Sequence, residues 1–476
     1  MSAQSAKIVT SWVSFQKIKV RIMKKRNYEI DMCSGTIMDK LITFSLPLML
    51  SGVLQLMFNA VDIVIVGRFT GSEALAAVGS TSALINVFTN LFMGVSLGSN
   101  VLAARFYASG RTKEMSETVH TSILFALISG IVMAVIGLIF SRAALELMGT
   151  PADVIDHSTL YMRIYFLGMP FFMLYNYGAS ILRAVGDTRR PLIFLIISGL
   201  LNAGLNMFLV IVFHLGVAGV AIATVISQMV SCVLVLRCLC RSEGSYQLRL
   251  SDLTLKWQYL RQIFQVGIPA GIQSTVINFS NVLLQSSVNS FGSTAMAGYT
   301  AANNILSFLY VTVNSITQAC MSFTSQNYGV GNYRRMDKIL ADCVVLSVGA
   351  STVLGCVAYF FGPEILTVYT SDPEVVKCGT EVLAFTTTTY FLCGLMDLFP
   401  GPMRGMGYSA VPMLLSIIGT VGTRIVWIFG FFPHNRSLSF LFLSYPASWI
   451  FSIILQIICL YFVRRRVYPA SERKLR

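Results

Sequence analysis

The amino-acid sequence predicts an all-α integral membrane protein of twelve transmembrane helices, arranged as two parallel repeats of six helices. Three observations support this fold class: an apolar composition, a series of long apolar runs, and an internal repeat. Of the 476 residues, 55% are hydrophobic and 12% are charged, and the mean hydropathy is +0.70. Soluble domains carry roughly 25% charged residues, so the composition disfavours a water-soluble protein.

A transmembrane helix needs about 20 mostly apolar residues, and twelve runs of the sequence meet this requirement. Several runs are longer than the bilayer is thick, so we expect tilted helices or helices that extend beyond the membrane. In chain order the runs are 41–66, 74–104, 119–140, 159–182, 191–212, 215–240, 260–290, 295–325, 339–361, 379–400, 411–432 and 439–463.

These runs divide the chain into five predicted parts. A basic cytosolic tail (1–36) precedes a six-helix lobe (37–240), and a polar cytosolic linker (241–259) leads to a second six-helix lobe (260–463) and a second basic tail (464–476). The linker is too short to be a catalytic domain.

The basic residues predict the orientation in the membrane. Most Lys and Arg fall in the tails and in alternate loops, whereas only Arg68, Arg142, Lys377 and Arg436 fall in the other loops. Because cytoplasmic loops carry an excess of Lys and Arg, we expect both termini in the cytoplasm and the protein in the inner (plasma) membrane. The net charge of +14 then reflects topology and contacts with anionic lipid, and we expect no nucleic acid partner.

The two lobes resemble each other at a constant shift of about 221 residues. FYASGRTKEM (106–115) aligns with NYGVGNYRRM (327–336), and LRAVGDTRRP (182–191) aligns with MRGMGYSAVP (403–412). Six spans per repeat is an even number, so the repeats are parallel, as in alternating-access transporters that hold substrate between two halves. The second alignment defines a repeated motif that we expect in cytosolic loops: Arg183, Gly186 and Pro191, then Arg404, Gly407 and Pro412.

Polar side chains form stripes along several apolar runs. Ser51, Gln55, Asn59 and Asp62 have spacings that place them on one helical face. Since polar groups facing lipid are costly, such faces should meet other helices or water. For any single residue the alternative is a hydrogen bond between helices. The predicted cavity-lining residues are Gln55, Asn59, Asn278, Asn281, Gln285 and Asn303.

Asp62 is the strongest candidate for a functional residue. A carboxylate in hydrocarbon costs roughly 2.5–3.5 kcal/mol on insertion scales, and intramembrane carboxylates usually have a functional role. The structural alternative is an ion pair, for which Arg163 and Arg424 are the intramembrane cations. A further acidic residue, Asp397, is expected to pair with Arg424.

Three other polar residues are predicted to complete a site around Asp62. Asn202 and Asn206 are four residues apart in one run, and Thr224 lies in the small-residue stretch GVAGVAIAT (216–224) of the next. Together the four side chains offer oxygen atoms suited to a proton or a small alkali cation. We therefore predict H⁺ or Na⁺ as the coupling ion and no other cofactor or metal.

Motifs of enzymes and of ATP-driven pumps are absent from the sequence. Nothing resembles a phosphate-binding loop, a nucleophile elbow or a metal-binding pair, and the spans contain no paired catalytic Asp or His residues. We therefore do not expect an enzyme. A channel is also disfavoured, since no segment resembles a pore helix or a selectivity filter.

With these residues in view, the chain resembles the multidrug and toxic compound extrusion (MATE) family, and most closely its DinF-like prokaryotic branch, over about residues 37 to 463. The resemblance is carried by VDIVIVGRFTGSEALAAVG (61–79), by RAVGDTRRP (183–191) with its echo RGMGYSAVP (404–412), and by LNAGLNMFLV (201–210). It implies a V-shaped pair of lobes and efflux of organic cations and amphipathic drugs in exchange for Na⁺ or H⁺.

The resemblance also implies roles for individual residues. The aspartate of the family's first span falls on Asp62, and its partners fall on Asn202 and Thr224. Members of this branch often carry a second aspartate where this chain has Asn206, so a pair of carboxylates sharing a proton cannot form here. We expect small-molecule drugs or toxic metabolites as substrates and a monomer in the lipid bilayer; the alternative function is that of a lipid-linked precursor flippase of the same superfamily.

Overall fold

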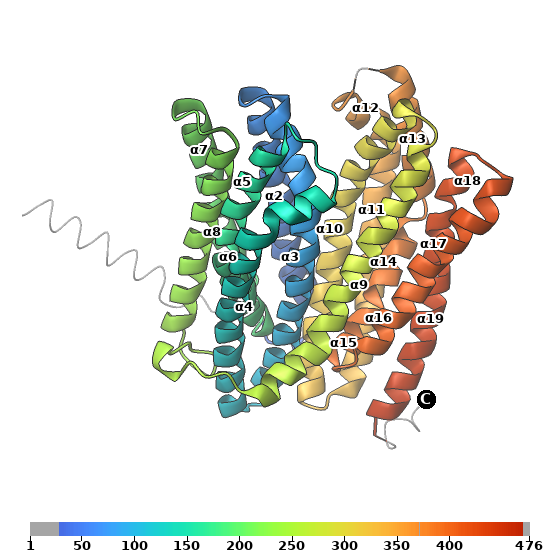
Figure 1. Ribbon diagram of the computed structural model, residues 1–476. Helices are drawn as coiled ribbons and strands as arrows, with labels where there is room; N and C mark the ends of the chain where they lie inside the picture. Colours follow the sequence, from blue (N-terminus) through green and yellow to red (C-terminus); the bar gives the residue numbers. More distant parts are fainter. Residues whose placement is uncertain (1–27, 371, 470–476) are drawn as a thin grey trace, which may run out of the picture.

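The computed structural model describes residues 28–370 and 372–469, and this part of the chain folds into a bundle of long helices (Figure 1). Of the two predicted basic tails, residues 1–27 and 470–476 lie outside the described residues. The first lobe contains α2 (Met38–Phe69), α3 (Ser72–Ala108), α4 (Thr112–Leu147), α5 (Ile155–Leu167), α6 (Met169–Ala184), α7 (Arg189–Met207), the π-helical turn η1 (Phe208–Val212) and α8 (Gly216–Arg241).

The second lobe follows after the predicted linker, which contains the short 3₁₀ turn η2 (Leu250–Asp252). Its elements are α9 (Trp257–Asn289), α10 (Ser293–Gly329), α11 (Tyr333–Phe360), α12 (Gly362–Thr367), α13 (Pro373–Thr387), α14 (Tyr390–Leu398), α15 (Pro400–Gly405), α16 (Ala410–Ser416), η3 (Ile417–Gly422), α17 (Thr423–Val426), η4 (Trp427–Phe431), η5 (Phe432–His434), α18 (Leu438–Phe442) and α19 (Ser444–Val467).

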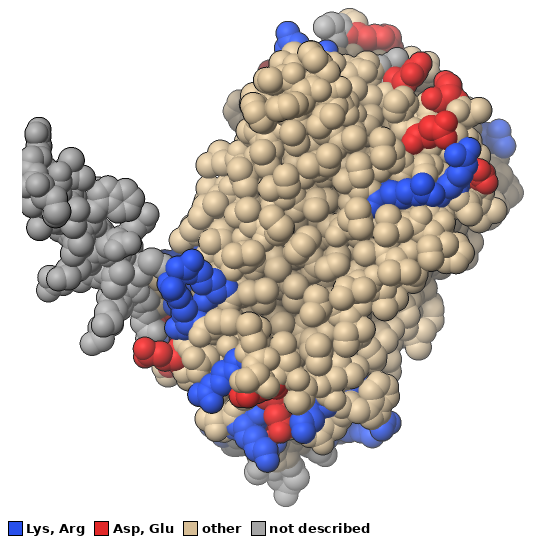
Figure 2. Space-filling view, turned by 60° about the vertical axis from the view of Figure 1, so that its left-hand side comes forward, with Lys and Arg blue, Asp and Glu red and all other residues tan. Residues whose placement is uncertain are grey.

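The predicted apolar runs all form helices. In the described part of the chain, nine helices are long and apolar enough to cross a membrane, and the pair α13 and α14–α15, bent by 50°, would be a tenth. The run 159–182 is broken at Gly168 and Pro170 into α5 and α6, and the run 260–290 forms the more polar α9. Figure 2 shows a broad band without charged residues between the charged ends of the molecule. The chain is therefore an all-α, multi-pass membrane protein.

The backbone repeats itself in the two lobes. Gly71 and Gly292, which precede α3 and α10, share φ 97° and ψ 177°. Gly186 and Gly407 have φ angles of 92° and 94°, a region that glycine enters without steric cost. Equal angles at positions related by the sequence shift confirm the predicted internal repeat.

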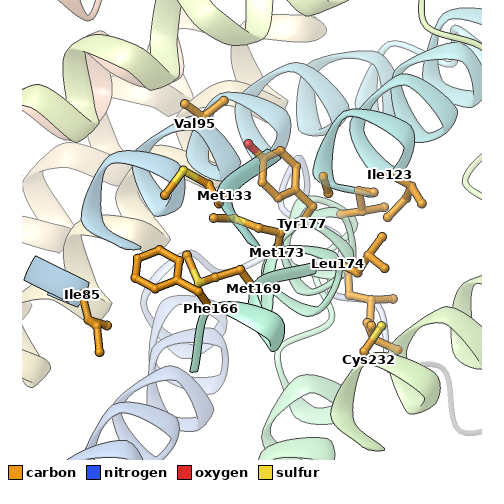
Figure 3. Packing of buried hydrophobic residues seen from close by; sticks show 14 of the residues in the cluster. Ile85, Val95, Ile123, Met133, Phe166, Met169, Met173, Leu174, Tyr177 and Cys232 are labelled. Atoms are coloured by element: carbon orange, nitrogen blue, oxygen red, sulfur yellow. The ribbon is translucent and has the colours of Figure 1, made fainter. Parts of the chain in front are cut away.

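The first lobe has its own core, which Figure 3 shows around α6. Phe166, Met169, Met173 and Tyr177 are buried between α3, α4 and α8. The flexible methionine side chains fill irregular gaps between these helices, and Gly137 of α4 leaves room for the Phe166 ring. A separate core fills the second lobe, so each lobe has a hydrophobic core of its own.

Both described ends of the chain lie on one face of the bundle, which we call the terminal face. Met32, before α2, and Tyr468, after α19, belong to the same buried cluster. Leu41 and Phe44 of α2 join this cluster, and the Phe44 ring meets the edge of Phe323 in α10 at 5.6 Å between centroids. The beginning of the first lobe therefore packs into the second.

The two lobes meet most closely where α3 crosses α9, in the halves of both helices nearer the terminal face. A Cβ atom added at Gly94 would lie 2.3 Å from Cα of Gly271, and one added at Gly98 would lie 2.2 Å from the Ile263 carbonyl oxygen. Gly267 is equally close to the backbone at Val95, at 2.4 Å. Small residues let membrane helices approach to backbone contact, so these glycines hold the lobes together at this face.

Residues 28–36 form a non-helical strap across the terminal face. On the second lobe, Arg335 donates to the carbonyl oxygens of Met32, Ser34 and Gly35 at 3.1, 2.6 and 2.9 Å. Met32 is fully buried. In the sequence this segment could be predicted only as part of a tail, because backbone carbonyl contacts leave no pattern in the sequence.

The strap also contacts the first lobe. The carboxylate of Glu29 accepts hydrogen bonds from Tyr107 and Tyr246 at 2.7 and 2.6 Å. A Cβ added at Gly186 would lie 2.5 Å from the Ile30 carbonyl oxygen, so the strap lies directly on the turn after α6. The strap therefore bonds to both lobes and closes the terminal face.

We predict that Gly98→Val destabilises the lobe contact, because its side chain must displace the α9 backbone. Overpacking of this kind costs about 1–3 kcal/mol or more, and thermal unfolding of the purified protein measures the loss. Gly349→Val is the matched control, since a Cβ at Gly349 meets no atom within 4 Å. Equal unfolding temperatures for the two variants would contradict the close contact.

We predict that Arg335→Ala releases the strap, because it removes three charge-assisted hydrogen bonds. Cys33 lies in the strap, is half-buried, and has a thiol pKa that burial raises above its ordinary value. If the strap is held in place by ~1.4 kcal/mol less free energy, the Cys33 thiol should react with maleimide roughly tenfold faster. Peptide mass spectrometry measures this rate. The control Lys338→Ala changes an exposed residue of the same helix, and an equal rate in both variants would refute the strap contacts.

Candidate functional site

The structure brings Asp62, Asn202, Asn206 and Thr224 together inside the first lobe. They come from α2, α7 and α8, and a chain of hydrogen bonds links them. Asn206 donates to the carboxylate of Asp62 and, at 3.3 Å, to the Asn202 side-chain oxygen. Asn202 in turn donates to the hydroxyl of Thr224 at 3.4 Å.

The amide of Asn206 is the centre of this cluster. Asn206 is fully buried, and its oxygen Oδ1 finds no donor among the described residues. Buried polar atoms are nearly always satisfied, so a free amide oxygen beside a carboxylate fits a proton or a small cation that is not part of the protein. Two residues after Asn206, α7 gives way to the π-helical turn η1, a deviation often found at functional sites.

The cluster has neighbours that the sequence analysis missed. Tyr161 and Tyr165 of α5 lie near Asp62, and Gln228 of α8 lies near Tyr165. Gln228 follows Thr224 by one helical turn, a spacing that could have indicated it. The two tyrosines had no such signal, because aromatic residues are frequent in apolar runs.

Asp62 has no basic partner in the described part of the chain, where no Lys or Arg nitrogen lies within 4.0 Å of it. Arg163 is exposed on α5, and Arg424 lies in the second lobe with Asn281. The structural alternative for Asp62, an ion pair with either arginine, is therefore wrong.

The predicted cavity-lining residues are not part of this hydrogen-bonded cluster and lie on α2, α9 and α10. Gln55 and Asn59 are exposed on α2, and Asn278 and Asn281 are exposed on α9. Gln285 is half-buried and donates to Asn289 at 3.0 Å. The sixth, Asn303, is half-buried on α10.

The repeated motif lies at the terminal face, but only its glycines occupy turns. The arginines are in the last turns of α6 and α15, where Arg183 donates to Ser180 at 2.8 Å and Arg404 to Gln273 at 2.7 Å. The prolines, Pro191 and Pro412, lie in the first turns of α7 and α16. The expectation of a loop for all six residues was therefore wrong, because helix ends extend into the motif from both sides.

The two copies of the motif are contact points for the opposite lobe. Arg105 of α3 donates to the Gly405 carbonyl oxygen at 3.5 Å, and its guanidinium lies 4.8 Å from the ring centroid of Tyr328. Gln326 of α10 donates to the Ala184 carbonyl oxygen at 2.7 Å. The donors Arg105 and Gln326 occupy equivalent positions of the two repeats, and so do the acceptors Gly405 and Ala184. Two equivalent hydrogen bonds therefore join the lobes.

Asp187, in the turn between α6 and α7, is the titratable group of the first motif. Its carboxylate accepts from the backbone N–H groups of Arg189 and Arg190 and forms an ion pair with the Arg190 side chain at 3.1 Å. Burial nevertheless dominates and raises the pKa of Asp187 to about 6.

We predict a pH-dependent stability from Asp187. Because its pKa is higher in the folded protein than in the unfolded chain, stability falls as the pH rises from about 4 through 6, by at most about 3 kcal/mol. Asp187→Asn should lack this slope, so the difference in unfolding temperature between the variant and the wild type should change over this range. Parallel pH curves for the two proteins would contradict the raised pKa.

Two parallel six-helix lobes in contact at one face define a membrane transporter built from repeats. The family model described as MatE matches residues 47–208 and 269–429, one segment in each lobe. A probable multidrug resistance protein of Bacillus subtilis, YoeA, is 30% identical over 87% of this chain and 91% of its own length. The multidrug export protein MepA of Staphylococcus aureus is 25% identical over 79% of this chain and 83% of its own length.

Solved structures agree in fold. An outward-facing MATE transporter superposes with a TM-score of 0.84 at 19% identity, covering 93% of this chain and 99% of its own. A Pyrococcus furiosus transporter, described as having a binding pocket of reverse polarity, gives a TM-score of 0.85 at 20% identity, with the same coverage of both chains. The chain belongs to the MATE family.

Proposed function

We propose that this protein is a secondary active multidrug efflux transporter. It exports organic cations and amphipathic drugs by antiport with H⁺ or Na⁺, through alternating access between its two lobes. The proposal rests on Asp62, a carboxylate within a membrane span that is bonded to an amide and has no basic partner among the described residues. The names of the curated relatives, which are multidrug resistance and export proteins, support the substrate class.

The coupling ion would act on the bonds around Asn206. With Asp62 ionised, the Asn206 amide donates to the carboxylate. A proton or Na⁺ on Asp62 neutralises its charge, and the free Oδ1 of Asn206 can then accept from the acid or bind the ion. Turning the amide changes its bond to Asn202 and hence the packing of α7 against α2 and α8.

This local change would alternate with drug binding. An organic cation is attracted to an ionised Asp62 and loses that attraction once the carboxylate is neutralised. Ion entry would therefore favour drug release, and the lobes would part at the terminal face to admit the next drug. In the proposed orientation the terminal face is cytoplasmic, the protein lies in the plasma membrane, and it acts as a monomer.

The alternative, a lipid-linked precursor flippase, would require a strongly cationic central cavity. The two intramembrane arginines do not form one, since Arg163 is exposed on α5 and Arg424 is buried in the second lobe. Drug efflux is therefore the better-supported function.

We predict that Asp62→Asn lowers ion-driven efflux at least tenfold, because an amide neither titrates nor carries charge. Efflux of ethidium from cells is measured with Na⁺ and pH varied separately, so that the condition which drives the wild type identifies the ion. The control Asp153→Asn removes an exposed carboxylate outside the helices and should pump like wild type.

Two results would count against the proposal. If Asp62→Asn expresses normally and pumps like wild type, the coupling site lies elsewhere. If the wild type moves no drug under any ion gradient, the flippase alternative becomes the leading one.

A further inference from the structure

We propose that the second lobe contains an anion-binding site at Arg424, which takes the carboxylate of zwitterionic substrates. This inference rests on the proposed function and names a substrate class for it: small molecules that carry both a cationic and a carboxylate group.

Arg424 lies at an irregular point of the second lobe. It belongs to α17, a four-residue α-helical piece between the π-helical stretches η3 and η4. π-Helical deviations recur at functional sites, and the first lobe has one beside Asn206. The side chain of Arg424 is only 4% exposed, so its charge lies in the interior of a membrane protein.

The partners of this buried cation are all neutral. Its Nη1 donates to Asn281 Oδ1 at 2.7 Å and to Ser280 Oγ at 3.4 Å. The guanidinium carbon lies 4.7 Å from the ring centroid of Tyr445. The Nε atom is buried and has no hydrogen-bond partner in the described part of the chain.

No carboxylate neutralises Arg424. The expected partner, Asp397, instead interacts with Arg404 of α15 and with Tyr310 and Asn314 of α10, so the predicted Asp397–Arg424 pair is wrong. Among the described residues no other Asp or Glu oxygen lies within 4.0 Å of Arg424. Buried charges are normally paired, and an uncompensated one is strongly unfavourable. An anion from outside the protein would supply the missing charge.

An anion can reach this guanidinium through Asn281. Asn281 is exposed although its oxygen bonds to Arg424, and Asn278, one turn earlier on α9, is exposed as well. Amides facing lipid would be costly, which places this face of α9 toward water. The Asn281 oxygen thus occupies the position of an anion oxygen and can be displaced by turning one side chain.

The geometry of the guanidinium suits a carboxylate. Once Asn281 turns away, Nη1 and the neighbouring Nη2 present the two donors at the end of the planar fork, and carboxylates bind such forks in a bidentate manner. The ring of Tyr445 supports the flat face of Arg424 and is itself fixed by a 2.8 Å hydrogen bond to Tyr299. Lysine would offer the charge without the fork.

The two lobes therefore carry complementary unpaired charges. The first holds the carboxylate of Asp62, and the second holds the guanidinium of Arg424. A zwitterion carries a group of opposite charge for each of them, whereas a simple organic cation carries one only for Asp62. This difference separates the role of Arg424 from that of the coupling site.

Two dyes that differ in a single group test the proposal. Tetramethylrhodamine methyl ester is a cation, and free-acid tetramethylrhodamine adds a carboxylate. Their affinities for the purified full-length protein in nanodiscs are measured by fluorescence anisotropy. Arg424→Gln should weaken binding of the free acid at least tenfold and change the ester less than twofold, and Arg424→Lys should fall in between. Arg163→Gln, which removes the exposed arginine of α5, should change neither affinity.

A second variant keeps the test decisive if Arg424→Gln fails to fold. Asn281→Asp places a permanent carboxylate against Arg424 from an exposed position, so it should also weaken the free acid at least tenfold and spare the ester. If the wild type and the folded variants bind the free acid with equal affinity, or if the variants lose equal affinity for both dyes, the anion site is contradicted. The proposed efflux function is not affected by either result. Wild type that binds neither dye would count against the proposed function itself.

Discussion

The backbone contact between α3 and α9 is the constraint on which the other contacts at the terminal face depend. Only glycine at positions 94, 98, 267 and 271 leaves room for this approach. Because the helices touch there, Arg105 reaches the carbonyl of Gly405 and Gln326 reaches that of Ala184. The strap can then bond to both lobes at once. A wider separation would break all of these bonds together, so the face should open and close as a unit.

The interiors of the two lobes differ although their backbones repeat. The first lobe holds an ionised or protonated carboxylate among amides and a hydroxyl, and the second holds a guanidinium among neutral groups. Arg424 lies between two π-helical stretches, and Asn206, which binds Asp62, lies shortly before another. The repeat thus supplies a common frame, and in the proposed mechanism different side chains on that frame give the first lobe affinity for cations and the second lobe affinity for anions.

Much of the fold could be predicted from the sequence because its signals are periodic. Apolar runs, basic loops and the repeat shift indicated the helices, the two lobes and the equivalent turns at Gly186 and Gly407. Asp62 and the three residues around it could be grouped because their spacings place them on helix faces and the family resemblance related the spans.

What could not be predicted depends on contacts without a pattern. The strap binds through backbone carbonyl oxygens, so its sequence reads only as a tail. The choice of Arg404 rather than Arg424 as the neighbour of Asp397 depends on how α14 is oriented, which no spacing records. Tyr161 and Tyr165 resemble any aromatic residues in a span until the fold places them beside Asp62.

The central claim is that the state of Asp62 controls the contact between the lobes at the terminal face. Spin labels at Lys113 of α4 and Lys338 of α11, both exposed and on different lobes, would report their separation by pulsed electron resonance as pH and Na⁺ are varied. The account predicts one short distance and a second, longer one whose population depends on the ion in wild type but not in Asp62→Asn. A distance distribution that responds to the ion identically in both proteins would contradict it.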